Sequence, residues 1–293
     1  MEIEKQKNLK IKCFSSFCDS KTCKDNFENI VEPNILEKYK SNQIIFTTDE
    51  DYTHVIILNT AMPFININVP KENVLGLAYE PIEFLNITQE FVEYAKKHIG
   101  KYYIGSKHNL PEPFIERFAF MWFCPPIRYK SENAFVKTKA MSIVLSDKIS
   151  APGHKYRHVL VENILKNKLP INIYGKGANR YTNIGGSWIK GEFNDVEPYH
   201  DYCFTICIEN YRSNDYISEK FMNPIMNHCM PIYIGAKNIS TYFNHFISLT
   251  GDLKTDINIL MSILREPKKY YMNPYNERNI FQMNIFEHIK DIF

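Results

Sequence analysis

A polar segment in the C-terminal half of this 293-residue chain carries side chains suited to binding a diphosphate. It runs from Glu209 to Lys220, after an apolar run and before a helical pattern. The first turn of a helix favours an anion through its backbone N–H groups and its dipole. Lys220 would add a positive charge, Glu219 would accept hydrogen bonds from a ribose diol, and Tyr216 would lie against a base or a sugar. The same spacing also fits an ordinary helix start with Ser218 as N-cap, so spacing alone does not decide.

The elements around this segment predict two successive α/β domains. Strands are expected at residues 10–17, 43–48, 54–58, 73–79 and 102–104, and again at 140–145, 171–174, 202–208 and 230–234. Helices are expected at 88–99, 154–167, 218–227, 257–265 and 279–293. This rhythm is typical of parallel sheets covered by helices. We expect two Rossmann-like domains that face each other across a cleft, at residues 1–138 and 139–275, followed by a C-terminal helix at 276–293.

Polar residues gather where the predicted strands end. Ligands of such sheets bind beyond the carboxyl ends of the strands. The residues at those ends are Glu80, Ser146, Gly175, Glu209 and Asn210. This position makes them candidates for a site without specifying its chemistry.

The polar segment and the residues around it resemble the signature of the α1,3/α1,4-fucosyltransferases of glycosyltransferase family 10. That signature reads Glu-Asn, five residues, Tyr-x-Thr-Glu-Lys, then a helix and a Pro-x-x-x-Gly strand. The matching residues here are Glu209, Asn210, Tyr216, Ser218, Glu219, Lys220, Pro231 and Gly235. Upstream, the strand that ends at Ser146 and residues 173–177 and 183–186 look like further landmarks of the family. The resemblance covers about residues 140–250.

The resemblance implies a GT-B fold and inverting transfer of L-fucose from GDP-fucose to a hydroxyl of a glycan, in an α1,3 linkage. It places donor binding at Arg157, Asn210, Tyr216, Glu219, Lys220, Ser146 and Gly175. It implies no obligatory metal, although Mg²⁺ or Mn²⁺ could stimulate. Ser218 replaces the family's Thr and keeps the hydroxyl, whereas Asp147 replaces an Asn and residues 211–214 differ from the small residues of some relatives. Another deoxy- or amino-sugar nucleotide as donor, or a glycan-binding module without activity, stays open.

The expected chemistry also requires cations for the leaving diphosphate and a base for the attacking hydroxyl. Arg157 and Lys220 are the candidate cations, although Arg157 also fits the surface of a basic helix. Glu80 is the candidate base, because it ends a predicted strand before Pro81 and the family has a catalytic Glu at a comparable strand end. Glu83 is its rival, and a plain loop carboxylate is the alternative for Glu80.

Three further groups of residues have types or spacings that occur in binding sites. Asp49 and Asp51 form a DxD pattern that binds metal in other glycosyltransferases, but a solvated turn is the more common use of two such carboxylates. Cys13, Cys18 and Cys23 recur at five-residue intervals, wider than structural zinc spacing, and are expected to be free thiols. For the acceptor, segment 106–135 offers aromatic and polar side chains: Phe120, Trp122, Phe123, Tyr129, His108, Glu112 and Glu116.

Composition limits the partners and the compartment. With 35 Lys and Arg against 33 Asp and Glu, the net charge is +2, which argues against a dedicated nucleic-acid binder. The N-terminal residues lack the apolar core of a signal peptide, and the chain lacks a run of apolar residues that could cross a bilayer. From the sequence we therefore expect a cytoplasmic protein whose partners are a nucleotide sugar and a glycan.

Overall fold

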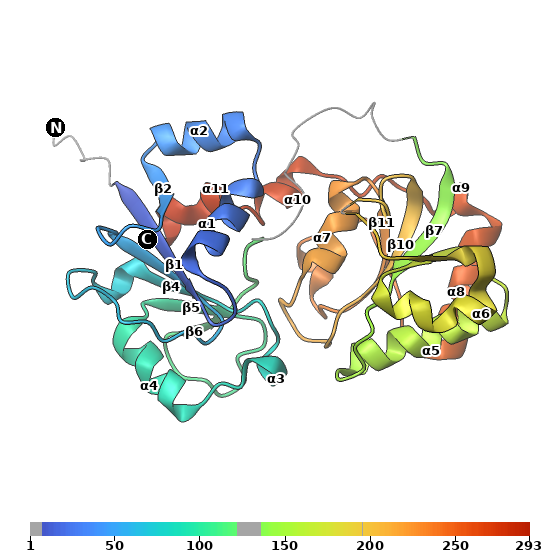
Figure 1. Cartoon of the computed structure of the whole chain (residues 1–293), viewed down its shortest axis with the longest axis horizontal. Helices are drawn as coiled ribbons and strands as arrows, with labels where there is room; N and C mark the ends of the chain where they lie inside the picture. The colour runs from blue at the N-terminus through green and yellow to red at the C-terminus, as the bar shows by residue number, and fades with distance from the viewer. Residues whose placement is uncertain (1–7, 122–135, 195) are drawn as a thin grey trace. The chain divides into compact units, whose positions relative to one another are not determined.

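The computed structural model describes residues 8–121, 136–194 and 196–293 (Figure 1). Its contacts divide the chain into two compact units. The N-terminal unit takes the described residues of Met1–Arg128, together with Ser213–Tyr216 and Ile280–Phe293, and the C-terminal unit takes those of Tyr129–Arg212 and Ile217–Asn279. Each unit contains one six-stranded sheet, and every pairing between its strands is parallel. The prediction of two parallel α/β units is therefore confirmed.

The sheet of the N-terminal unit has the strand order β2-β1-β3-β4-β5-β6. Its strands are β1 (Leu9–Ser15), β2 (Ile44–Thr47), β3 (His54–Leu58), β4 (Val74–Leu77), β5 (Lys101–Ile104) and β6 (Phe114–Glu116). Its helices are α1 (Ser20–Asn29), α2 (Pro33–Ser41), α3 (Ile82–Leu85), α4 (Gln89–His98), α10 (Glu277–Phe281, in part) and α11 (Ile285–Ile292). Chain order reverses between β1 and β3, because β2 lies on one side of β1 and the later strands lie on the other.

Helix α4 shows how local sequence sets these elements. Thr88 caps it by accepting a hydrogen bond from the Phe91 backbone N–H at 3.1 Å. Phe91, Val92 and Ala95 are buried on one face, as the spacing predicts. Helices α1 and α2 were not predicted, because α1 buries only Cys23 and Phe27 and its other residues are polar. Too few apolar residues remain there to show helical periodicity.

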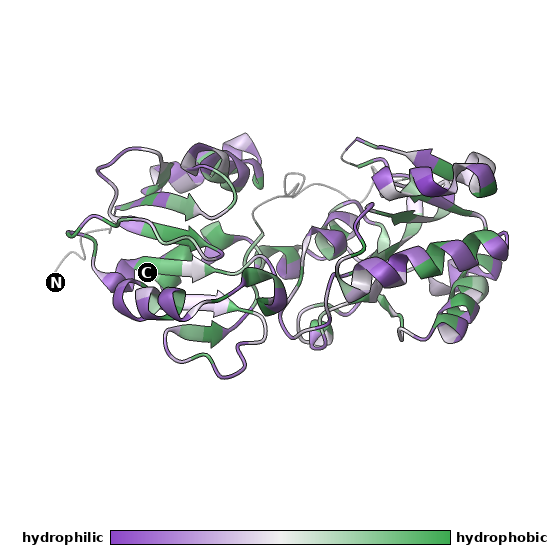
Figure 2. Cartoon of the chain, turned by 60° about the horizontal axis from the view of Figure 1, so that its bottom comes forward, coloured by the Kyte–Doolittle hydropathy of each residue, from purple (hydrophilic) through white to green (hydrophobic). Residues whose placement is uncertain are grey.

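The sheet of the C-terminal unit has the strand order β12-β11-β10-β7-β8-β9. Its strands are β7 (Lys139–Val144), β8 (Ile171–Tyr174), β9 (Ile189–Gly191), β10 (Tyr202–Ile208), β11 (Met230–Ile234) and β12 (Ile247–Ser248). Its main helices are α5 (Pro152–Lys166), α7 (Glu219–Met226) and α8 (Leu253–Arg265), with the short α6 (Thr182–Gly185) and α9 (Pro267–Tyr270). Figure 2 shows apolar residues gathered in the sheets and hydrophilic residues along the outer helix surfaces. Chain order reverses here between β7 and β10, and such a reversal is where ligands bind in α/β sheets.

The end of the chain packs with the N-terminal unit. Phe286 of α11 stacks on Tyr39 with ring centroids 4.7 Å apart and meets Phe46 edge-on at 5.3 Å. Lys101 Nζ donates to the Ile292 carbonyl at 2.6 Å. The predicted single helix at 279–293 is two helices, and Asn284 caps the second by accepting from the Phe286 N–H at 3.1 Å.

Candidate functional site

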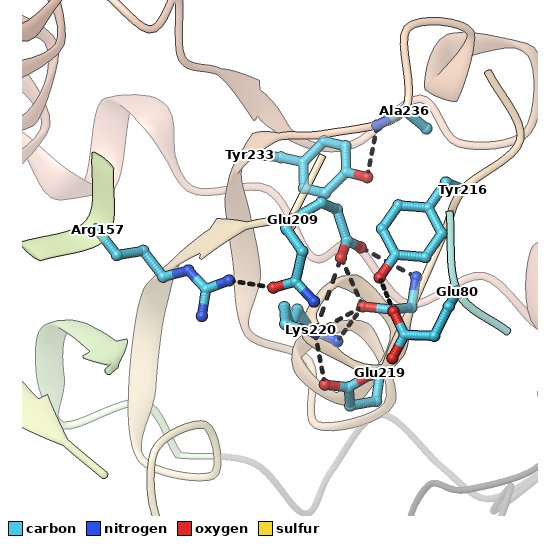
Figure 3. A network of polar contacts seen from close by, with 10 residues as sticks. Glu80, Arg157, Glu209, Tyr216, Glu219, Lys220, Tyr233 and Ala236 are labelled. Carbon is cyan, nitrogen blue, oxygen red and sulfur yellow. Dashed lines mark hydrogen bonds and ion pairs between the residues drawn. The ribbon is translucent and has the colours of Figure 1, made fainter. Parts of the chain in front are cut away.

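The two elements beside the reversal in the C-terminal unit bring Arg157 and Asn210 together. Helix α5 follows β7, and Asn210 follows β10, which pairs directly with β7. The Arg157 Nη2 donates to Asn210 Oδ1 at 2.5 Å, and both side chains are buried (Figure 3). These residues are 53 positions apart. Both are predicted site residues, and the fold places them at the same edge of the sheet.

Gly153 allows α5 to come this close. Its N–H donates to the Asn210 carbonyl at 3.0 Å. A Cβ at Gly153 would overlap the Glu209 carbonyl oxygen. A larger residue would therefore push the start of α5, and Arg157 with it, away from the strand end.

Glu209 closes the polar loop onto the start of helix α7. Its side chain is fully shielded and accepts hydrogen bonds from the Ser218 N–H at 3.0 Å and from the Ser218 hydroxyl at 2.7 Å. Burial raises the pKa of Glu209, because a carboxylate loses its hydration there, while Lys220 Nζ at 3.9 Å favours the charged form. Glu209 is therefore a positioning residue: it fixes the two ends of the loop that runs from residue 209 to residue 218.

Lys220 lies in the first turn of α7 and remains partly accessible. Its Nζ is 2.9 Å from Glu219 Oε1 and 3.9 Å from Glu209 Oε2, with 24% of its side chain exposed. Burial alone lowers the pKa of Lys220, but the carboxylates of Glu219 and Glu209 outweigh it and raise that pKa. Lys220 therefore carries its charge at neutral pH, beside the helix N-terminus that Ser218 caps. The predicted N-cap role of Ser218 is confirmed.

A cavity of about 450 Å³ lies beside this network, within the C-terminal unit. It is lined by Pro152, Gly153, Tyr156, Ile208, Glu209, Asn210, Tyr211, Arg212, Ile234, Thr250 and Gly251. These residues come from the start of α5, the ends of β10 and β11, and the loop before α8. The volume is within the range of small-ligand sites.

Asp256 holds two walls of this cavity in place. Its carboxylate is fully buried and accepts hydrogen bonds from the Thr250 N–H at 2.8 Å, the Thr250 hydroxyl at 2.7 Å and the Gly251 N–H at 2.9 Å. It also accepts the Tyr156 hydroxyl at 2.5 Å, from α5. In the sequence Asp256 is one more acidic residue near a helix start, which gave no reason to single it out.

Ser146 and Gly175 end the neighbouring strands β7 and β8. The Ser146 carbonyl is 3.0 Å from His158 Nε2, and Gly175 has a φ of +93°, which favours glycine. His158 in turn contacts the Tyr181 hydroxyl at 2.9 Å. Among the described residues, neither Ser146 nor Gly175 lines the cavity of about 450 Å³. Their predicted part in donor binding stays a prediction.

Residues Ser213–Tyr216, in the middle of the polar segment, belong to the N-terminal unit, which also contains Glu80. The Tyr216 hydroxyl donates to Glu80 Oε2 at 3.4 Å (Figure 3). Glu80 follows β4 and is half-buried, and its neighbour Tyr79 is held by a backbone N–H bond to Asn59 Oδ1 at 2.8 Å. The rival Glu83 is exposed. Tyr216 therefore orients the predicted base, a contact that the sequence did not indicate.

The other candidate residues are engaged elsewhere or lie outside the described part. Asp51 pairs with Lys10 Nζ at 2.5 Å, and the described residues contain no group of three or more His, Cys, Asp or Glu arranged to hold a metal. Phe120 is fully buried and packs in the core, with its ring centroid 5.7 Å from that of Phe118. Glu116 Oε1 accepts from the Lys107 N–H at 3.3 Å. Trp122, Phe123 and Tyr129, which were predicted to stack on an acceptor, lie outside the described residues. No described helix combines the length and apolarity needed to cross a membrane.

Known proteins resemble this chain in sequence and in fold. The family model for glycosyltransferase family 10 (fucosyltransferase), C-terminal part, matches residues 135–290. A crystal structure of an α1,3-fucosyltransferase has a TM-score of 0.57 at 14% identity and covers 97% of this chain and 90% of its own. A structure of an α1,3-fucosyltransferase with GDP-fucose has a TM-score of 0.51 at 14% identity, and the match covers 97% of this chain and 90% of that one. A mutant of S. aureus TarM with UDP has a TM-score of 0.50 at 10% identity, and the match covers 81% of this chain and 54% of that one. These neighbours show that the two parallel α/β units form the GT-B fold.

Proposed function

This chain belongs to glycosyltransferase family 10, and on that premise we propose that it transfers L-fucose from GDP-fucose to a hydroxyl of a glycan. The transfer inverts the configuration at the anomeric carbon of the sugar and forms an α1,3 linkage. The attacking oxygen bonds to that carbon, its proton goes to a base, and the bond from carbon to diphosphate breaks. The GDP that leaves carries the electron pair of that bond.

The observation that carries this proposal is the position of two cations at the strand ends of the C-terminal unit. Arg157 comes from α5 and Lys220 from the first turn of α7, and they flank the reversal between β7 and β10. As the bond to the diphosphate breaks, negative charge grows on the leaving oxygens, and preorganised cations stabilise it. An Arg suits contacts with two oxygens at once, whereas a Lys acts as a point charge. These two residues supply the charge that the leaving group requires, so the proposal includes no obligatory metal.

We assign the nucleoside to the cavity of about 450 Å³ beside these cations. Asn210 is on its wall and holds the Arg157 guanidinium, which links nucleoside and diphosphate recognition. Glu219, whose carboxylate neighbours Lys220, is assigned to the ribose diol. Tyr216 is assigned to the base or the sugar, and Ser146 and Gly175 to backbone contacts at the adjacent strand ends.

We assign Glu80 as the general base. Its carboxylate is half-buried, and the Tyr216 hydroxyl donates to Oε2 at 3.4 Å, which holds the group that would accept the proton of the attacking hydroxyl. Tyr216 belongs to the same polar segment as the donor residues.

A second donor class has one observation in its favour. Tyr211 and Arg212 line the cavity at positions where some relatives have small residues. Large side chains there change the space for the nucleoside and its sugar, which favours a different deoxy- or amino-sugar nucleotide. A thermal-shift screen against GDP, UDP, CDP and their sugars separates the donors, because a ligand that binds the folded state raises the melting temperature.

The screen is followed by assays of donor hydrolysis and transfer, with and without EDTA. We expect the largest shift with GDP and GDP-fucose, and release of GDP that EDTA does not abolish. A larger shift with another nucleotide would move the assignment to the second donor class. Binding without any hydrolysis or transfer would favour the alternative of a glycan-binding module without activity.

A further inference from the structure

Two of the cysteines near the start of the chain lie in contact. Cys18 is in the loop after β1 and is half-buried, whereas Cys23 is in the first turns of α1 and is fully buried. Their Sγ atoms are 3.3 Å apart. Cys13, on β1, is also buried, and burial raises the pKa of its thiol, with smaller contributions from Cys23 and Cys18. The sequence suggested only loose thiols, because it did not place Cys23 in a helix.

The cap of helix α1 fixes the geometry of this pair. Asp19 accepts from the Thr22 N–H through its side chain at 2.7 Å and from the Cys23 N–H through its carbonyl at 3.1 Å. The Ser20 hydroxyl donates to the Cys13 carbonyl, which ties the start of α1 to the end of β1. Cys18 directly precedes this cap. The two sulfur atoms are therefore held close by backbone structure rather than by a chance meeting of mobile side chains.

We propose that Cys18 and Cys23 are a thiol–disulfide site, oxidised by low-molecular-weight disulfides such as oxidised glutathione. The Cys18 thiolate attacks one sulfur of the oxidant, forms a mixed disulfide and releases one glutathione thiolate. The Cys23 sulfur then attacks Cys18 Sγ and releases the second glutathione. Two electrons pass from the protein to the oxidant, and the two thiol protons end on the two released glutathiones.

Exposure sets the order of these steps. Cys18 is the member of the pair that reaches solvent, so the oxidant meets it first. Burial raises the pKa of the Cys23 thiol, and contact with Cys18 raises it further, so Cys23 is a poor first nucleophile. Once Cys18 carries glutathione, the proximity of Cys23 compensates for its low reactivity. A disulfide bond is about 2.05 Å long, so only about 1 Å of approach is needed.

Cys18, the half-buried member of the pair, lies in the wall of a second cavity, in the N-terminal unit. This cavity has a volume of about 460 Å³ and is lined by Phe14, Ser15, Ser16, Cys18, Asp19, Ser20, Ala61, Met62 and Pro63. These residues come from the last part of β1, from the loop and helix start after it, and from the loop after β3. The order of this sheet reverses between these two strands. Oxidation would draw the Cys18 loop inward at the place where α/β sheets bind ligands. The disulfide would thereby couple redox state to the shape of this cavity, independently of the donor chemistry proposed above.

The test uses the full chain in glutathione buffers of increasing oxidised fraction. Exchange is then stopped with acid, the chain is unfolded so that the buried Cys23 can react, and free thiols are alkylated and mapped by mass spectrometry. We expect Cys18 and Cys23 to lose alkylation together, to appear as one cross-linked peptide and to recover with dithiothreitol. The Cys18→Ser variant should leave Cys23 alkylatable at every buffer composition. The Cys23→Ser variant should instead accumulate a stable glutathione adduct at Cys18, because the second step is lost.

The Cys203→Ser variant is the matched control, since Cys203 is another half-buried cysteine, in the C-terminal unit, and it should not change the oxidation of the pair. Circular dichroism of each variant checks that it is folded. The proposal is overturned if the wild-type protein keeps both thiols in the most oxidising buffer. It is equally overturned if a stable adduct at Cys18 forms in the wild type, or if Cys13 replaces Cys18 in the cross-linked peptide.

Discussion

At the scale of single residues, the site depends on buried charged groups held by hydrogen bonds. Arg157 is only 5% exposed, and the buried Glu209 carboxylate accepts two hydrogen bonds from Ser218. A buried charge costs free energy unless hydrogen bonds and opposite charges surround it. The residues that maintain this arrangement are therefore expected to be sensitive to substitution.

Replacing either cation should weaken binding of GDP. We expect Arg157→Ala and Lys220→Ala each to raise the Kd for GDP about 10- to 100-fold, which is the loss of one or two charge-assisted hydrogen bonds. Isothermal titration calorimetry measures this directly. Lys155→Ala, an exposed position on the same helix, is the control and should bind as the wild type does. Wild-type affinity in Lys220→Ala would refute the donor assignment.

Replacing the proposed base should separate binding from chemistry. Glu80→Gln keeps the shape of the side chain but removes its basicity, so we expect the transfer rate to fall by about 10²- to 10⁴-fold. The Kd for GDP should stay within about twofold of the wild type. Glu83→Gln, at an exposed neighbour, should leave both quantities unchanged. A larger effect in Glu83→Gln would assign the base to that residue instead.

At the scale of elements, one buried carboxylate joins two walls of the nucleoside cavity. Asp256→Asn keeps the size of the side chain but turns one acceptor oxygen into a donor that faces N–H and O–H groups. We expect a loss of about 1 to 3 kcal/mol of unfolding free energy and a weaker affinity for GDP. Asp252→Asn is the control, because Asn also caps helices well and Asp252 caps the same helix. Denaturation by urea and GDP titration distinguish the two variants, and equal behaviour would contradict the role of Asp256.

We expect the free energy of unfolding to depend on pH through His154, which lies in the first turn of α5. His154 Nδ1 accepts from the Ala151 N–H at 3.2 Å, so this nitrogen must be unprotonated. Burial lowers the pKa of His154 from 6.5 to about 4, and the charges of Arg157, Lys148 and Lys220 act in the same direction. The folded-state pKa is the lower one, so the stabilisation is complete above pH 6.5 and is lost as the pH falls toward 4.

We expect the unfolding free energy to fall over that window by on the order of 1 to 3 kcal/mol from this residue. His154→Gln should flatten the fall, since Gln does not titrate. His245→Gln, at an exposed position, should retain it. Urea unfolding midpoints measured at half-unit pH steps give the comparison, and an unchanged slope in His154→Gln would contradict this origin.

At the scale of the whole molecule, the chain returns to its first unit at its end. Helix α11 buries Ile285, Phe286, Ile289 and Ile292. Of these, Phe286 packs against the rings of Tyr39 and Phe46 in the N-terminal unit. We expect Phe286→Ala to lower the unfolding free energy of that unit by about 3 to 5 kcal/mol. Lys290→Ala, on the exposed side of the same helix, should change it by less than about 0.5 kcal/mol. Equal denaturation curves for the two variants would show that α11 does not support the unit.

The sequence by itself determined the local elements and the chemical types at the site. Short apolar runs predicted the strands that became β3, β8, β10 and β11, and helix α4 followed from its cap and its periodic apolar face. The signature from Glu209 to Lys220 gave the family and the candidate donor residues. These features depend on residues a few positions apart, so the local sequence is enough to predict them.

Only the tertiary structure decided which distant residues meet. The order of the strands placed Arg157 against Asn210 and assembled the cavity between α5, β10 and the loop before α8. It also gave Asp256 its role and brought Cys18 into contact with Cys23 through an unpredicted helix. Sheet pairing and helix packing depend on which apolar surfaces are buried over the whole chain. Because the hydrophobic effect is non-directional, a short stretch of sequence does not specify its distant partners.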